Sequence, residues 1–144
     1  MIRQDFSSAV LLCMVVSLLS VGGLRQCEAQ KSASDQYARC AKACIDCRKA
    51  CTACSKHCVS MVAAGMKEHV KSKSLADDCA DICAAAANIT ARRGPMSAAI
   101  CAACAKACDA CGAECRKWPA MEPMKYCAQS CSDCAKACRE MLKS

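Results

Sequence analysis

Cysteine and small apolar residues recur along this chain at spacings of three and four, with charged residues between them. The first row holds six cysteines, namely Cys40, Cys44, Cys47, Cys51, Cys54 and Cys58. Because an α-helix turns once every 3.6 residues, this spacing places all six side chains on one helix face. The pattern predicts a helix that begins near Ser34 or Asp35 and ends at Gly65.

Three further rows of cysteine follow with the same spacing. They comprise Cys79 and Cys83, then Cys101, Cys104, Cys108, Cys111 and Cys115, and finally Cys127, Cys131, Cys134 and Cys138. Ser74 and Asp77 resemble a capping box, so we expect the second helix to begin there and to continue to about Arg92.

Glycine and proline separate the remaining predicted helices. Gly94-Pro95 is typical of the end of one helix and the start of the next. The third helix is expected to end near Lys117, before Pro119, and Pro123 to open the fourth. Short connections favour antiparallel neighbours, so the fold class is all-α, an antiparallel up-down-up-down four-helix bundle with a Cys-lined core. No strand period or glycine-rich phosphate loop is visible.

The first 29 residues have the pattern of an export signal. An apolar run at 9–24 follows Arg3, and Cys27-Glu28-Ala29 offers a cleavage site. We therefore expect a signal peptide at 1–29, a bundle domain at 30–144 and a periplasmic location, with no membrane attachment after cleavage. An uncleaved membrane anchor is the alternative.

Composition limits what the core can contain. The chain has 19 cysteines in 144 residues but only one Trp, two Tyr and one Phe, so large rings cannot fill the interior. The net charge of +7 comes from cations scattered singly on the faces opposite the cysteines. That arrangement indicates a solvated surface and not a nucleic-acid site.

The cysteine rows have three possible explanations: core filler, disulfides or metal ligands. Filler does not need a thiol at every core position. Cβ atoms three or four residues apart on a helix are too distant for an unstrained disulfide. Two thiolates on opposite sides of one ion need about 4 to 5 Å, which such neighbours can reach. Continuous rows suit the low coordination number of Cu(I), so we favour storage of many Cu(I) ions. A disulfide-stapled structural protein and a zinc or heavy-metal buffer remain alternatives.

Softer and weaker ligands gather at one end of the predicted bundle. Continuing the rows brings Met61, Trp118 and Met124 to this end. The other donors nearby in the sequence are His57, Met66, His69 and Met121. We interpret the methionines and histidines as a port for copper, with a flexible hydrophobic cap as the alternative. The opposite end carries Tyr37, Thr90, Ser97 and Met141, which resemble a plug.

Several segments resemble the exported branch of the bacterial four-helix-bundle copper storage proteins. The likeness covers the chain from about Ser34 onward, and it is most specific in CDACGAECRKWP at 108–119 and CAQSCSDCAKAC at 127–138. The segment HCVSM at 57–61 is similar to the motif at that family's copper opening. A methionine expected one turn after Met61 is replaced by Ala64, for which Met66 and His69 are candidate substitutes.

The resemblance implies a reduced, thiol-lined bundle that binds Cu(I) mostly through pairs of thiolates. It also implies a homo-oligomer, often a tetramer. Since no nucleophile with a plausible base and orienting partner is visible in the sequence, we expect no catalytic activity. Copper ions would be its partners, together with a copper-accepting enzyme or chaperone.

Overall fold

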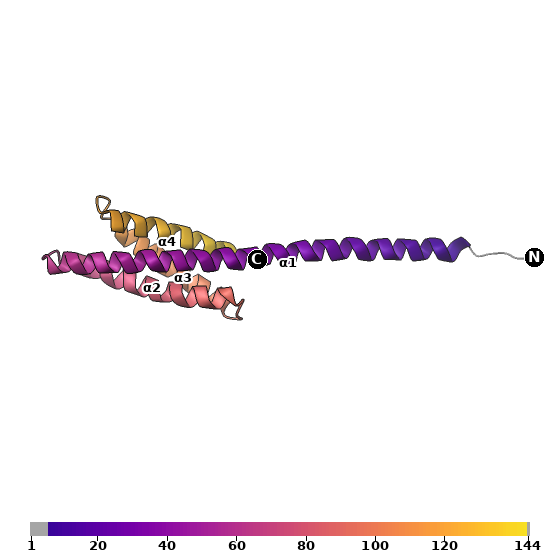
Figure 1. Ribbon diagram of the computed structural model, residues 1–144, viewed down its shortest axis with the longest axis horizontal. Helices are drawn as coiled ribbons and strands as arrows, with labels where there is room; N and C mark the ends of the chain where they lie inside the picture. The colour runs from indigo at the N-terminus through magenta and orange to yellow at the C-terminus, as the bar shows by residue number, and fades with distance from the viewer. Residues whose placement is uncertain (1–5, 144) are drawn as a thin grey trace, which may run out of the picture. The chain divides into compact units, whose positions relative to one another are not determined.

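The computed structural model describes residues 6–143, with side chains from residue 34 onward. It contains four α-helices, which are α1 (Phe6–Ala63), α2 (His69–Ala91), α3 (Ser97–Cys115) and α4 (Glu122–Met141) (Figure 1). Two compact units are present, Met1–Asp35 and Gln36–Ser144. The side chains of the predicted export signal lie outside the described residues.

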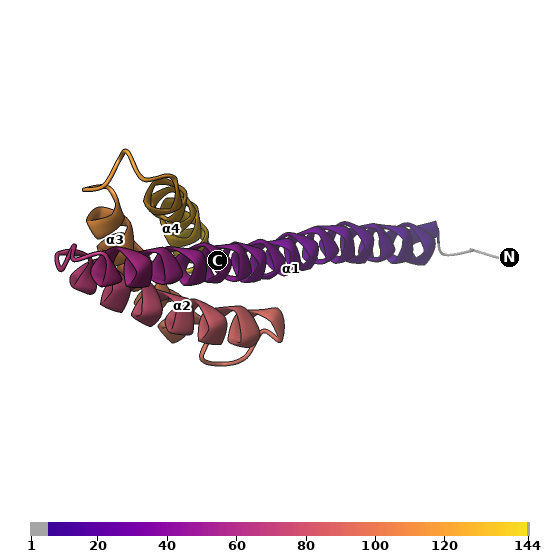
Figure 2. The ribbon, with the colours of Figure 1, turned by 60° about the vertical axis from the view of Figure 1, so that its left-hand side comes forward.

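The second unit is an antiparallel four-helix bundle. From Gln36 onward, α1 lies beside the other three helices, which alternate in direction (Figure 2). The ends of the bundle meet as the up-down-up-down prediction requires: Cys40 near the start of this unit contacts Cys101 on α3 and Cys138 on α4. The predicted fold class is confirmed.

The first helix starts earlier than expected. The sequence predicted a beginning near Ser34, whereas α1 begins at Phe6. No proline interrupts residues 6–63, so nothing in that stretch forces a helical backbone to stop. Within the part of the chain that the structure describes, no helix has the length and apolarity needed to cross a membrane.

Gly65 ends α1 as predicted. Its φ of 94° is in the left-handed region, which glycine adopts without a steric penalty. The Gly65 and Met66 amides donate to the carbonyls of Val62 and Met61, at 3.0 Å each, and so satisfy the last carbonyls of the helix.

The predicted capping box at the start of the second helix is wrong. Helix α2 begins at His69, immediately after a turn in which the His69 amide donates to the Met66 carbonyl at 3.2 Å. Ser74 is therefore inside the helix and exposed. Asp77 instead forms an ion pair with Lys73, one turn earlier, at 2.6 Å.

The turn between α2 and α3 also differs in detail. Arg93, not Gly94, has the left-handed backbone, with φ of 53°. The Gly94 amide donates to the Ile89 carbonyl at 3.0 Å, and α3 begins at Ser97, two residues after Pro95. In α4 the proline, Pro123, occupies the first turn as predicted.

Cysteine and alanine form most of the core. The buried alanines lie beside the cysteine rows and comprise Ala41, Ala50, Ala76, Ala86, Ala87, Ala105, Ala128 and Ala135. Gly112 of α3 packs against α4, and a Cβ atom there would be 3.2 Å from the Cys131 Cβ. Small side chains let the helices approach closely, which brings thiols from different helices within contact distance.

Candidate metal centre

All seventeen cysteines of the described side chains are buried free thiols. Each has at most 1% of its surface exposed. They are the four predicted rows, and together we call them the thiol column: Cys40, Cys44, Cys47, Cys51, Cys54, Cys58, Cys79, Cys83, Cys101, Cys104, Cys108, Cys111, Cys115, Cys127, Cys131, Cys134 and Cys138.

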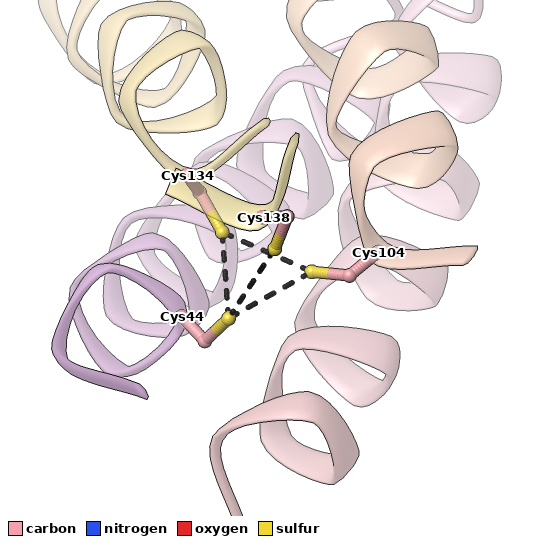
Figure 3. A group of neighbouring side chains, drawn as sticks. All are labelled: Cys44, Cys104, Cys134 and Cys138. Atoms are coloured by element: carbon pink, nitrogen blue, oxygen red, sulfur yellow. Dashed lines mark hydrogen bonds between the residues drawn. The ribbon is translucent and has the colours of Figure 1, made fainter. Parts of the chain in front are cut away.

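Thiols from different helices come together in small groups along the column. In Figure 3, Cys44 of α1, Cys104 of α3 and Cys134 and Cys138 of α4 point toward one another. The Cys44 sulfur is 3.9 Å from that of Cys104 and 3.8 Å from that of Cys138. Three helices thus contribute to one potential metal site.

The two cysteines of α2 join the middle of the column. The Cys79 sulfur lies 3.7 Å from Cys108, and the Cys83 sulfur lies 3.6 Å from Cys104. On the side of α1, the Cys47 sulfur is 3.8 Å from that of Cys108. The thiol of Cys108 therefore meets thiols from two other helices.

Contacts between helices outnumber the contacts along a helix that the sequence suggested. Neighbours four residues apart do touch, at 3.9 Å for Cys47 and Cys51 and 4.0 Å for Cys79 and Cys83. Two thiolates bound to one ion are about 4 to 5 Å apart, so small rotations of these side chains suffice to bind it. The sulfur atoms are thus close to the spacing that a two-coordinate ion requires, and cross-helix pairs supply most of this geometry.

A smaller group closes one end of the column with mixed ligands. The Met124 thioether lies 3.4 Å from the Cys54 sulfur and 3.7 Å from the Cys58 sulfur. The Cys54 sulfur is also 3.7 Å from that of Cys115, and the Cys58 sulfur is 4.0 Å from His69 Nδ1. Thiol, thioether and imidazole donors thus meet at this end.

Outside this group the structure brings together further residues of the predicted port. His57 Nε2 is 3.4 Å from the Met121 sulfur, and both residues are half-buried. The His69 ring is wholly buried, with its centroid 4.1 Å from that of the Trp118 ring. The structure therefore places His57, His69, Met121 and Met124 at one end, as predicted.

Met61 and Met66 lie at the turn after α1. Both are half-buried, and the Met66 amide donates to the Met61 carbonyl. The Met66 carbonyl accepts from the His69 amide at 3.2 Å. Among the described side chains, the thiols contact the Met124 sulfur and not those of Met61 and Met66. We refer to His57, Met61, Met66, His69, Met121 and Met124 together as the port residues, after the role that the sequence suggested for them.

The opposite end carries mainly hydroxyl groups and one methionine, Met141. The Thr90 hydroxyl donates to the Ala86 carbonyl at 2.7 Å, and the Ser97 hydroxyl donates to the Gly94 carbonyl at 2.6 Å. Both residues are buried, as is Met141. We call this the closed end.

Burial helps to keep the Cys54 and Cys58 thiols protonated at neutral pH. It raises the pKa of the Cys58 thiol, because a thiolate is poorly solvated there. For Cys54, the contact with Cys115 and then burial raise the pKa. A metal ion that binds these sulfurs as thiolates must therefore displace their protons.

Sequence reasoning missed a buried carboxylate beside the port. The Glu114 side chain is 7% exposed and lies between Lys117 and the start of α2. Glu114 directly precedes Cys115 and is outside the three- and four-residue spacing of the cysteines, so the sequence did not indicate that it is buried.

Known proteins share this sequence and architecture. The family described as copper storage protein matches residues 33–143. An uncharacterized cysteine-rich protein of Bacillus subtilis, YhjQ, is 39% identical over 85 residues, which are 58% of this chain and 76% of that protein.

Solved structures of copper storage proteins have similar folds, and two of them illustrate the likeness. The Cu(I)-bound copper storage protein BsCsp3 is 37% identical, with a TM-score of 0.69 over 74% of this chain and 98% of that one. A cytosolic copper storage protein from Streptomyces lividans, in a structure with five coppers, is 35% identical. Its TM-score is 0.72, over 79% of this chain and 98% of that one.

Proposed function

This chain belongs to the copper storage protein family and stores multiple Cu(I) ions, and we propose that the thiol column supplies the ligands. The proposal rests on seventeen buried thiols whose sulfur atoms lie within contact distance across helices. Soft thiolates favour Cu(I), and a thiolate can bridge two ions, so that neighbouring sites can share a sulfur.

The sharing of thiols favours Cu(I) over zinc. Cys47 belongs to two groups of four neighbouring thiols, one with Cys79 and the other with Cys83. Cys134 likewise belongs to two such groups. Closed tetrahedral zinc sites each need four ligands of their own in the usual structural case, so overlapping groups cannot all hold zinc in that way.

The port residues would receive copper before it reaches the thiols. Half-buried His57 and Met121 lie outside the fully buried Cys58 and Met124. Thioether and imidazole bind Cu(I) more weakly than thiolate, so an ion can pass inward to stronger ligands. Met61 and Met66, at the adjacent turn, would extend this series outward.

A competition titration tests storage. Cu(I) is added to the reduced protein in the presence of a chelator of known affinity, and Zn(II) is tested in parallel. We expect more than about ten Cu(I) per chain, from the arithmetic of bridging thiolates, and much weaker zinc binding. Binding of only one or two Cu(I), or equal filling by zinc, would contradict the proposal.

A thiol assay separates storage from the disulfide alternative. Freshly purified metal-free protein should have nearly all thiols reactive toward an alkylating reagent after unfolding without reductant. Few reactive thiols would favour a disulfide-stapled structural protein instead.

We also propose that residues 1–29 direct export and are removed near Ala29, leaving a periplasmic storage protein. The family match begins at residue 33 and the compact bundle at Gln36, both after this segment. N-terminal sequencing of protein from a periplasmic fraction tests the proposal, and recovery of the full-length chain in the cytosol would refute it.

The mature protein is proposed to act without catalysis and as a homo-oligomer, which exchanges copper with an accepting enzyme or chaperone. Light scattering during size-exclusion chromatography tests the assembly: a tetramer is expected, and a strictly monomeric mass would exclude it.

A further inference from the structure

Glu114 is the one buried acidic residue among the described side chains, and it joins two segments of the port end. Its Oε2 atom accepts from Lys117 Nζ at 2.7 Å and lies 3.7 Å from Lys71 Nζ. Its Oε1 atom accepts from the Ser72 hydroxyl at 3.5 Å. One carboxylate thus links the start of α2 to the turn that follows α3.

The negative charge of Glu114 does not stabilise the helix that carries it. Glu114 lies in the last turn of α3, where the helix dipole disfavours a negative charge. The start of α2, by contrast, has no side-chain cap and no acidic residue in its first turn. The contacts from Lys71 and Ser72 to Glu114 therefore stabilise a helix start that has no side-chain cap.

The two fastened segments carry the stacked rings of the port. His69 precedes Ser72 by three residues, which places both on one face of α2. Trp118 directly follows Lys117. The rings of His69 and Trp118 are 4.1 Å apart with an interplanar angle of 31°. The contacts of Glu114 thus fix the spacing of the two backbone segments from which the rings extend.

One ring nitrogen of each side chain makes no hydrogen bond that would hold its ring in place. His69 Nε2 and Trp118 Nε1 are buried and have no hydrogen-bond partner among the described residues. The His69 ring of this stack lies near both neighbours: its centroid is 6.3 Å from that of the half-buried His57 ring, and its Nδ1 atom is 4.0 Å from the sulfur of buried Cys58. The His69 ring thus contacts the thiol column and lies near an outer donor, so a movement of the stack would alter the access of an ion to Cys58.

We propose that Glu114 is a positioning residue that holds the His69 and Trp118 rings closed over Cys58 and thereby limits the rate of copper exchange. It binds no copper itself. This inference rests on the proposed role of the port, and it adds a residue that sets how fast the port opens.

The variant Glu114→Gln tests it, because glutamine keeps the size of the side chain and removes its charge. We expect Cu(I) uptake, and release to a chelator, to become about three- to tenfold faster, as for the loss of one or two ion pairs. The number of Cu(I) bound at saturation should not change. In the metal-free protein, acrylamide should quench the fluorescence of Trp118, the single tryptophan of the chain, more strongly than in the unaltered protein.

Asp109→Asn is the matched control. It makes the same chemical change on α3 in an exposed ion pair with Arg139 of α4. Exchange rates and quenching should remain those of the unaltered protein.

Two results would overturn the inference. The first is a folded Glu114→Gln variant with unchanged exchange rates, and the second is unchanged quenching in that variant. Should this variant lose helicity, the double variant Lys71→Gln with Ser72→Ala removes only the contacts to α2 and leaves Lys117 paired, and the same criteria decide. The quenching measurement needs no copper, so failure of storage itself would be seen separately, as low Cu(I) binding by the unaltered protein.

Discussion

At the closed end of the bundle Cys40 meets Cys101 at 3.5 Å and Cys138 at 3.8 Å, whereas at the other end Cys58 meets a thioether and an imidazole. The closed-end hydroxyls of Thr90 and Ser97 donate to backbone carbonyls, and their hard oxygen atoms are poor ligands for soft Cu(I). At the port end, the outer donors His57 and Met121 are half-buried, and Met124 and Cys58 are fully buried. With the proposed roles, one column would combine tight retention at depth with exchange at one end.

Acidification should have the largest effect and should separate the two ends. Because their pKa values are raised, thiols such as Cys58 and Cys54 stay protonated through neutral pH in the metal-free protein. Binding between two thiolates then releases two protons, so affinity should fall by about 100-fold for each unit of decrease in pH. Thioether sulfur carries no proton, so retention by Met121 and Met124 should be far less sensitive.

Chelator competition at pH 6, 7 and 8, with proton release followed by an indicator, checks this dependence. A pH-independent affinity would mean that the thiols are ionised before copper arrives.

Removal of the outer donors should have the next largest effect. In the variant His57→Ala with Met61→Ala, Cu(I) uptake should slow by roughly tenfold, equivalent to about 1.4 kcal/mol in the barrier. Final capacity should change little, because the thiol column is intact. Stopped-flow loading measures the rate, with Met141→Ala at the closed end as the control. Equal rates in the His57 and Met61 variant and the unaltered protein would remove the port from the mechanism.

Loss of thiols in the middle of the column should affect capacity instead of rate. Replacing Cys108 and Cys111 by alanine should lower the Cu(I) content by about two ions, since each lost thiolate removes about one bridged site. Helicity should persist because alanine has a high helix propensity. Copper content after gel filtration and far-ultraviolet circular dichroism check both points. A collapse of helicity would show that the thiols also hold the fold together.

The sequence predicted the features that depend on helical period alone. The spacing of Cys40 to Cys58 defines one face of a helix in any context, so the rows, the bundle and the port end followed from it. Gly65 and Pro123 set helix boundaries through their own backbone restrictions, and the structure confirms both.

Features that depend on contacts between helices could not be predicted in this way. The period gives the face of a helix but not its axial position relative to another, so the pairing of Cys47 with Cys108 was not visible. Asp77 pairs with Lys73 and does not cap a helix, because α2 begins at His69, eight residues earlier in the chain. Burial of Glu114 likewise depends on Lys71 and Ser72, which lie more than forty residues away in the chain.

A change at the closed end should have the smallest effect, on stability alone. Thr90→Val keeps the side-chain shape but removes the hydrogen bonds to the Ala86 and Ala87 carbonyls, which should lower the free energy of unfolding by about 1 kcal/mol. The cost stays small because the Ala86 carbonyl keeps its helical amide partner. Urea denaturation of the reduced, metal-free protein measures it. Copper uptake should keep the rate of the unaltered protein, since no ion passes this end, and faster loading would reveal a second opening there.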